Sequence, residues 1–236
     1  MRRLVLALQL MTSLPLPAVR ADEGDFAAAI RWFPAAGLAV GAAVAAALWL
    51  GARIDPWAGA LFALLVWVAM TGALHLDGLG DIADGVGAAH GDRARLSAVL
   101  ADPHIGSFGV VAIVLQLLSK LVLLRLWAEL LPPWGLIGVA MVARIGPLAW
   151  TLWLPPLHEG LGSRFRQGVA PVHLIVWGVA ALGFCLWMPG LLAAAVLVAL
   201  WAWWLRVKIG GISGDGHGAG IEIIESALLG LLLVIR

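Results

Sequence analysis

Three aspartates recur at helical spacing in one glycine-rich segment of this 236-residue chain. Asp77, Asp81 and Asp84, which we call the first acidic cluster, would share one face of a helix because they stand four and three residues apart. Like charges at this spacing repel one another. A hard divalent cation such as Mg²⁺ would relieve the repulsion, since it takes oxygen ligands and keeps waters that a phosphate can replace. The cluster therefore predicts catalytic carboxylates that bind Mg²⁺ and act on a phosphorylated substrate.

The residues around the first acidic cluster favour a ligand site over the alternative, a solvated helix end. No Lys or Arg lies between residues 71 and 92, whereas a solvated end usually mixes in basic or hydroxyl side chains. The glycines interspersed between residues 78 and 87 are expected to let a bulky anion approach the backbone. His75, just before the cluster, is either a ligand contact or a hydrogen-bonded interior histidine.

A second acidic group follows a glycine-rich stretch near the C-terminus. Asp215 lies in that stretch, and Glu222 and Glu225 stand three residues apart at the start of the next apolar run. The backbone N–H groups of such a loop and of a helix N-terminus favour an anion, so Ser213 and Gly214 are predicted phosphate contacts. Asp215 is predicted to complete the metal site, or to accept a proton together with Glu222. The alternative is a flexible hinge whose acids complement the helix dipole.

Other polar residues are candidate contacts to the substrate. Asp102 and His104 precede an apolar run, although a plain turn would also use them. Lys120 and Arg144 fall inside apolar runs, where a charge is costly unless it faces a polar cavity or pairs with a carboxylate. Both are predicted to bind phosphate, and Arg144 is the stronger candidate because its guanidinium is always charged.

The elements that position these residues are predicted to be membrane helices. Hydrophobic residues make up 62% of the chain and charged residues 12%, against about 45–50% and about 25% in soluble domains. This composition predicts a single all-α domain, residues 1–236, that forms a polytopic membrane bundle of about six or seven helices. A net charge of +1 gives no field that favours nucleic acid. The predicted spans are 33–50, 57–76, 108–131, 134–154, 171–188, 191–207 and 221–235.

The long loops are predicted to lie together on one side of the membrane. If the spans alternate, that side and the adjoining helix ends hold ten Lys and Arg residues, against two on the other side. Positive residues favour the cytoplasm. Twelve of the fourteen carboxylates fall on the same side, so residues 77–107 and 208–225 are predicted to be active-site loops at the cytoplasmic face.

Residues 1–32 precede the first predicted span and contain a short apolar stretch, residues 4–19, after two arginines. This stretch lacks a clean small-x-small cleavage site, and two prolines interrupt it. We interpret it as an amphipathic or re-entrant segment that stays in the mature chain; a cleaved signal peptide is the alternative.

The motifs closely resemble those of a known family, the cobalamin synthases, which are the adenosylcobinamide-GDP ribazoletransferases of vitamin B12 biosynthesis. The resemblance lies in TGALHLDGLGDIADG (71–85), DPHIGSFG (102–109) and GGISGDGHGA (210–219) followed by Glu222. It begins at TSLPLP (12–17) and extends to the last span. Ser213 and His217 depart from the Thr and Leu that are common in the third motif, and Ala101 and His104 replace basic residues in the second.

Membership would imply a multi-pass enzyme of the bacterial inner membrane that requires Mg²⁺. It would join adenosylcobinamide-GDP to α-ribazole or α-ribazole 5′-phosphate, and would release GMP and adenosylcobalamin or its 5′-phosphate. A ribose hydroxyl oxygen of the acceptor would attack the phosphorus attached to cobinamide, with GMP leaving in line. The sequence leaves open whether copies of the chain form a homo-oligomer.

Two other functions place acids at membrane helices. A CDP-alcohol phosphotransferase also displaces a nucleoside monophosphate, but its signature needs Asp-Gly-x-x-Ala-Arg, and the segment that starts at Asp77 lacks the Ala-Arg. A cation transporter would use Asp77, Asp81 and Glu222 as an ion path, but it would need acids near the middle of the membrane rather than at one face.

Overall fold

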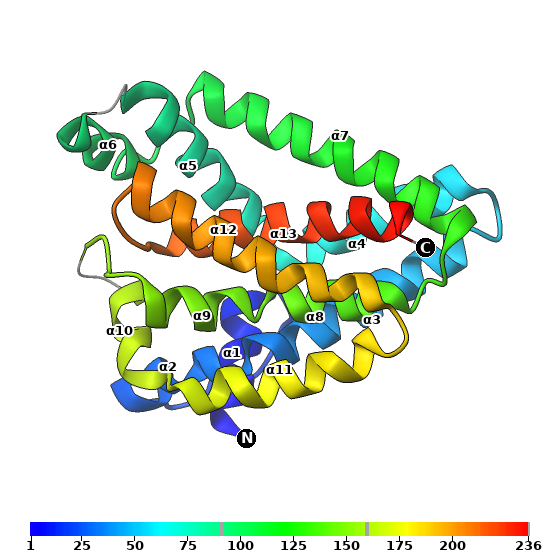
Figure 1. Cartoon of the computed structure of the whole chain (residues 1–236), viewed down its shortest axis with the longest axis horizontal. Coiled ribbons are helices and arrows are strands. Elements are labelled where there is room, and N and C mark those ends of the chain that lie inside the picture. The colour runs from blue at the N-terminus through cyan, green and yellow to red at the C-terminus, as the bar shows by residue number, and fades with distance from the viewer. Residues whose placement is uncertain (90–91, 159–160, 236) are drawn as a thin grey trace.

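The computed structural model describes residues 1–89, 92–158 and 161–235, and within these ranges the chain is a bundle of helices without β-strands (Figure 1). A lone parallel bridge joins Pro156 to Ile212. The first half of the chain contains α1 (Arg2–Met11), α2 (Glu23–Ala29), η1 (Ile30–Trp32), α3 (Phe33–Gly51), α4 (Pro56–Thr71), α5 (Leu74–Ala89), α6 (Arg93–Leu100) and α7 (Ser107–Leu130). The second half contains α8 (Gly135–Ala143), α9 (Gly146–Trp153), α10 (Leu161–Gly168), α11 (Pro171–Cys185), η2 (Pro189–Leu192), α12 (Ala193–Lys208) and α13 (Gly214–Val234).

The apolar helices confirm the predicted all-α membrane bundle. Among the described residues, five helical stretches are long and apolar enough to cross a membrane: Glu23–Gly51, Ser107–Leu130, Gly135–Trp153, Pro189–Lys208 and Gly214–Val234. The pair α4 and α5 passes the same test together and would make a sixth. The apolar helix α11 is shorter, with 15 residues. Large apolar side chains on α7, α11 and α12 are exposed, as expected for helices that face lipid.

The predicted span 57–76 is wrong at its end, because the helix breaks after Thr71 and α5 leaves at 84° to α4. Gly72 ends α4 in the left-handed region with φ of 59°, and Ala73 follows with the same φ. Glycine adopts this conformation freely, whereas alanine is strained there. The backbone N–H of Ser13 donates to the carbonyl of Met70 (2.8 Å), so the segment after α1 holds the end of α4.

The bend lays α5 across the start of α13, and glycines make the crossing close. A Cβ on Gly78 would lie 2.9 Å from the backbone of Asp215, and a Cβ on Gly218 would lie 3.1 Å from Cα of His75. On another side of α5, a Cβ on Gly87 would lie 2.6 Å from the ring of Phe108. These glycines therefore allow close helix packing, and the expected approach of a ligand to the backbone of residues 78–87 stays a prediction.

The long connections lie at one end of the bundle. In Figure 1 the segments around α6 and α10 and the connection between α12 and α13 lie at the left, and the short connections after α3, α7 and α11 lie at the right. The predicted loop 77–107 is largely helical, since it contains most of α5 and all of α6. The predicted loop 208–225 is helical from Gly214 onwards. The N-terminal segment begins with α1, which packs against α2, η1 and α3.

Candidate active site

The crossing of α5 and α13 brings three of the predicted carboxylates together. Asp77 is exposed and Asp81 is half-buried on α5, and Asp215 lies in the first turn of α13. The negative charges of Asp215 and Asp77 both act on Asp81. Asp77 and Asp81 have neither a hydrogen bond nor an ion pair within the described part of the chain. In this acidic face, Asp77, Asp81 and Asp215, no carboxylate pairs with a Lys or Arg of the described residues. His158 lies close enough to Asp215 for its positive form to act on that carboxylate.

Asp84, the third member of the first acidic cluster, has a different environment. Its side chain is buried, with 7% exposed. One carboxylate oxygen accepts the N–H of Gly106 (2.7 Å) and the other accepts the N–H of Gly109 (2.9 Å). Because Gly106 is the N-cap of α7, Asp84 satisfies two N–H groups that the helix itself leaves free. Asp84 thus holds the start of α7, and its predicted role as a metal ligand stays a prediction.

The start of α13 fits the predicted anion contacts. Ser213 is the N-cap, and its hydroxyl oxygen accepts the N–H of Gly216 (3.1 Å). The same hydroxyl donates to the carboxylate of Asp215 (3.4 Å). Gly214 is exposed, and a Cβ there would meet no atom within 4 Å. The first turn of α13 therefore has free space at Gly214, beside the acidic face. The same turn carries Asp215, which is part of that face.

Asp102 and His104 form a local turn on the surface. The carboxylate of Asp102 accepts both the backbone N–H of His104 (3.0 Å) and its ring Nδ1 (2.7 Å). These hydrogen bonds from His104 hold the pKa of Asp102 below its usual value. The turn leads directly to Gly106 and hence to Asp84, so it lies near the site, but the two predicted contact residues are engaged with each other.

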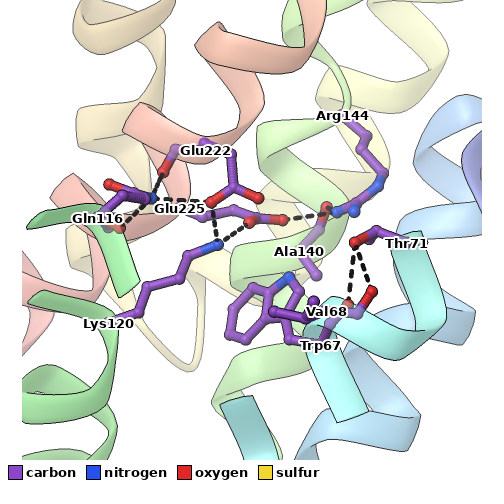
Figure 2. Close-up of polar contacts among 10 residues, drawn as sticks. Trp67, Val68, Thr71, Gln116, Lys120, Ala140, Arg144, Glu222 and Glu225 are labelled. Atoms are coloured by element: carbon purple, nitrogen blue, oxygen red, sulfur yellow. Dashed lines mark hydrogen bonds and ion pairs between the residues drawn. The ribbon is translucent and has the colours of Figure 1, made fainter. Parts of the chain in front are cut away.

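Lys120 and Arg144, the predicted phosphate contacts, are paired with glutamates inside the bundle (Figure 2). Nζ of Lys120 donates to Glu222 (2.7 Å) and to Glu225 (2.6 Å). Arg144, at the break between α8 and α9, donates to the other carboxylate oxygen of Glu225 (2.8 Å) and to the carbonyl of Ala140 (2.9 Å). At most 3% of any of these four charged side chains is exposed. Two positive charges thus face two negative ones in a buried, neutral network.

Two neutral residues complete the buried network. Nε2 of Gln116 donates to Glu222 (2.8 Å) and to the hydroxyl of Ser226 (2.8 Å). The ammonium of Lys120 lies 4.3 Å from the centre of the Trp67 ring. Glu222 therefore accepts hydrogen bonds from two side chains of α7. It also lies seven residues after Asp215, about 10 Å along the axis of α13, so the structure does not bring it to the acidic face.

The sequence pattern did not predict that Glu225, Gln116 and Trp67 belong to this network. A signal was present, because Gln116 and Lys120 are four residues apart on one apolar run and Glu222 and Glu225 are three apart on another. Polar residues on one face of a membrane helix usually find partners on another helix. Pairing the two faces would have predicted the contact.

A cavity of about 190 Å³ opens beside the acidic face. Asp77 and Asp215 line it, together with two buried histidines, His75 and His217. Among the residues that the structure describes, neither ring nitrogen of His75 has a hydrogen-bond partner, and Nδ1 of His217 has none either. The sequence allows two roles for His75, a ligand contact or a hydrogen-bonded interior histidine. In the structure it lines the cavity without the hydrogen bonds that an interior histidine usually has.

The described residues do not form a complete protein-only metal site: they contain no group of three or more His, Cys, Asp or Glu side chains placed to hold an ion. Mg²⁺ is commonly bound by one or two carboxylates, with substrate phosphates and waters completing the shell. The acidic face offers hard oxygen donors, and no Lys or Arg within the described ranges pairs with Asp77 or Asp81. It therefore fits a Mg²⁺ ion that arrives with a diphosphate.

A comparison with protein families decides the assignment. The family model described as cobalamin-5-phosphate synthase matches residues 3–233. The chain belongs to this family. The match confirms the resemblance that the motifs predicted, and it covers both the acidic face and the buried network of this cobalamin-5-phosphate synthase family member.

Curated relatives agree with the family match. The adenosylcobinamide-GDP ribazoletransferase of Novosphingobium aromaticivorans is 57% identical over 233 residues, which cover 97% of this chain and 95% of the relative. The relative of the same name from Thiobacillus denitrificans is 49% identical, with 97% and 94% covered. That from Laribacter hongkongensis is 48% identical, with 99% and 97% covered. No solved structure matches the chain. These findings support neither a CDP-alcohol phosphotransferase nor a cation transporter.

Proposed function

We propose that this chain is a membrane transferase that joins adenosylcobinamide-GDP to α-ribazole or its 5′-phosphate. The products are adenosylcobalamin or its 5′-phosphate, and GMP. The observation that carries the proposal is the acidic face, where two helices cross closely enough to gather Asp77, Asp81 and Asp215, with no Lys or Arg of the described residues paired to them. The names of the curated relatives support the same reaction.

The acidic face would hold Mg²⁺ through Asp77, Asp81 and Asp215. When bound there, Mg²⁺ would neutralise charge on the diphosphate and on the leaving oxygen. The repulsion among these carboxylates supports this assignment, because no Lys or Arg side chain pairs with Asp77 or Asp81 in the described ranges. Asp84 would contribute indirectly, because its hydrogen bonds fix the start of α7 against α5.

The chemistry is one displacement at phosphorus. A secondary ribose hydroxyl of the acceptor attacks, because the 5′-oxygen carries the phosphate that the product of the phosphorylated acceptor keeps. Its oxygen forms a new bond to the phosphorus that carries cobinamide, and the bond from that phosphorus to the bridging oxygen of GMP breaks. We assign the proton of that hydroxyl to the carboxylate of Asp215, which lines the cavity. The open first turn of α13, with Ser213 and Gly214, would contact a phosphate. Orientation of the two substrates supplies much of the remaining rate enhancement.

The cytoplasm is the proposed side of the acidic face. The long connections gather at one end of the bundle (Figure 1), and the basic residues of the chain are concentrated on the same side of the predicted spans. This placement would give access to water-soluble nucleotide substrates. Labelling of a cysteine introduced at Gly214 from either side of inside-out vesicles, in a Cys185→Ser background, tests it; reaction only from the periplasmic side would contradict it.

The experiment that tests the proposed function is GMP release by the purified chain in lipid vesicles. Release should require adenosylcobinamide-GDP, an acceptor and Mg²⁺. Asp81→Asn should abolish it, because the amide removes one negative oxygen ligand. Asp55→Asn is the matched control: Asp55 caps α4 at the opposite end, and asparagine also caps helices well. Near-normal turnover by the Asp81 variant would overturn the assignment of the site.

A further inference from the structure

The cavity beside the acidic face has aromatic walls. Phe26 of α2 stacks on Phe165 of α10 with ring centres 5.3 Å apart, and Phe33 of α3 meets Phe165 edge-on at 5.4 Å. All three rings line the cavity, and Met11 of α1 and Ile221 of α13 add to the apolar surface. An apolar pocket with a few polar groups is typical of a site for a flat organic ligand. A phosphate or a hydrated ion would not find hydrogen-bond partners on these aromatic and aliphatic side chains.

The polar groups inside the cavity are histidine nitrogens without partners. His75 is only 1% exposed, and neither its Nδ1 nor its Nε2 has a hydrogen-bond partner within the described ranges. His217 has its Nε2 at 3.4 Å from the hydroxyl of Thr151, so only its Nδ1 is unpartnered. Buried polar groups in native proteins are nearly always hydrogen-bonded. A neutral imidazole has one N–H donor, so His75 can donate to a ligand atom in the cavity.

The acidic face lies at the same cavity, and this fixes the direction of a ligand inside it. Asp77 and Asp215 line the cavity along with His75. A ligand that buries its apolar part among the aromatic rings would therefore hold its reactive end near the carboxylates.

Among the groups of the two substrates, one fits this cavity. Guanine has polar atoms on most of its edges and would leave several of them unpaired against apolar walls. The corrin ring, with its amide side chains, is far larger than about 190 Å³. The base of α-ribazole is a dimethylbenzimidazole, which is flat and apolar and has one free ring nitrogen that accepts a hydrogen bond.

We propose that the cavity holds the dimethylbenzimidazole base of the acceptor, with its free ring nitrogen toward His75 and its ribose toward Asp77 and Asp215. This inference rests on the proposed function and names the subsite of one of its substrates. The attacking ribose hydroxyl then lies on the side of Asp215, the carboxylate that takes its proton.

The first test fills the cavity. Leu10 of α1 lines it and is only partly buried, so Leu10→Trp adds bulk where the fold tolerates it. The KM for α-ribazole should rise at least tenfold, with the KM for adenosylcobinamide-GDP unchanged. Leu115→Trp is the matched control, because Leu115 is 58% exposed on α7. A rise in the KM for the donor instead, or no change in either, would overturn the proposal.

The second test removes the proposed hydrogen bond between His75 and the base, first by changing the acceptor and then by changing the histidine. The probe is the indole analogue of α-ribazole, in which a C–H replaces the free ring nitrogen. The wild-type chain should use it with kcat/KM about tenfold lower than for α-ribazole, the worth of one buried hydrogen bond. His75→Leu should use both acceptors equally well. If the wild type does not discriminate, or the His75 variant discriminates as strongly, His75 does not contact the base.

Failure of the proposed function and failure of the acceptor subsite give different results. If the wild-type chain releases no GMP from adenosylcobinamide-GDP with either acceptor form, the proposed function is wrong and the subsite is wrong with it. If the wild type is active but Leu10→Trp and His75→Leu leave acceptor use unchanged, the proposed function stands and only the subsite is wrong.

Discussion

The buried network of Lys120, Arg144, Glu222 and Glu225 allows a quantitative prediction. Lys120→Met alone leaves two carboxylates facing one guanidinium, and Glu222→Gln alone leaves two cations facing one carboxylate. An unbalanced buried charge of this kind costs about 3–5 kcal/mol of folding free energy. The double variant keeps the balanced pair of Arg144 and Glu225. It should therefore lose much less stability than the sum of the single variants, with a coupling of about 3 kcal/mol or more.

The measurement is the free energy of unfolding of the purified protein in micelles, followed by circular dichroism during titration with a denaturing detergent. The same cycle on Arg125 and Glu129 is the control, because this pair lies on the same helix but its side chains are 28% and 38% exposed. Its coupling should be about 0.3–0.5 kcal/mol. If the buried cycle gives a coupling no larger than the exposed one, the network does not contribute as the structure indicates.

Three further predictions concern the acidic face and its support. Asp84→Ala should lower the free energy of unfolding by about 1–3 kcal/mol, because it leaves two backbone N–H groups unpaired; a wild-type unfolding transition in the same detergent titration would contradict this. Gly78→Val should abolish GMP release, since its Cβ would lie 2.9 Å from the backbone of Asp215, whereas Gly183→Ala has open space and should be active. Removing Mg²⁺ with a chelator should stop GMP release, and added Mg²⁺ should restore it; release that persists in the chelator would exclude the proposed metal.

The sequence was sufficient for the helices and for part of the site. Long apolar runs fix the existence of a membrane helix, so most predicted spans agree with helices to within a few residues. The exceptions have local causes. The run 57–76 contains a break at Gly72 and Ala73, and the run 134–154 contains another at Arg144, where α8 ends. Neither break changes the hydropathy of its run, so composition does not reveal it.

Side-chain contacts between different helices were harder to predict than which residues share one face of a single helix. Spacing places Asp77, Asp81 and Asp84 on one face of a helix, but it does not show that Gly106 and Gly109 meet Asp84 after 22 and 25 residues. The pairing of Lys120 with Glu222 joins residues 102 apart. Such contacts depend on how the helices pack, which a pattern within one helix does not encode.

The acidic face at the crossing of α5 and α13 is proposed to carry out transfer to α-ribazole. GMP release by the purified wild-type, Asp81→Asn and Asp55→Asn proteins in vesicles, with both substrates and Mg²⁺, tests this role. We expect release by the wild type and the Asp55 variant, and none by the Asp81 variant. Equal release by all three proteins would contradict it.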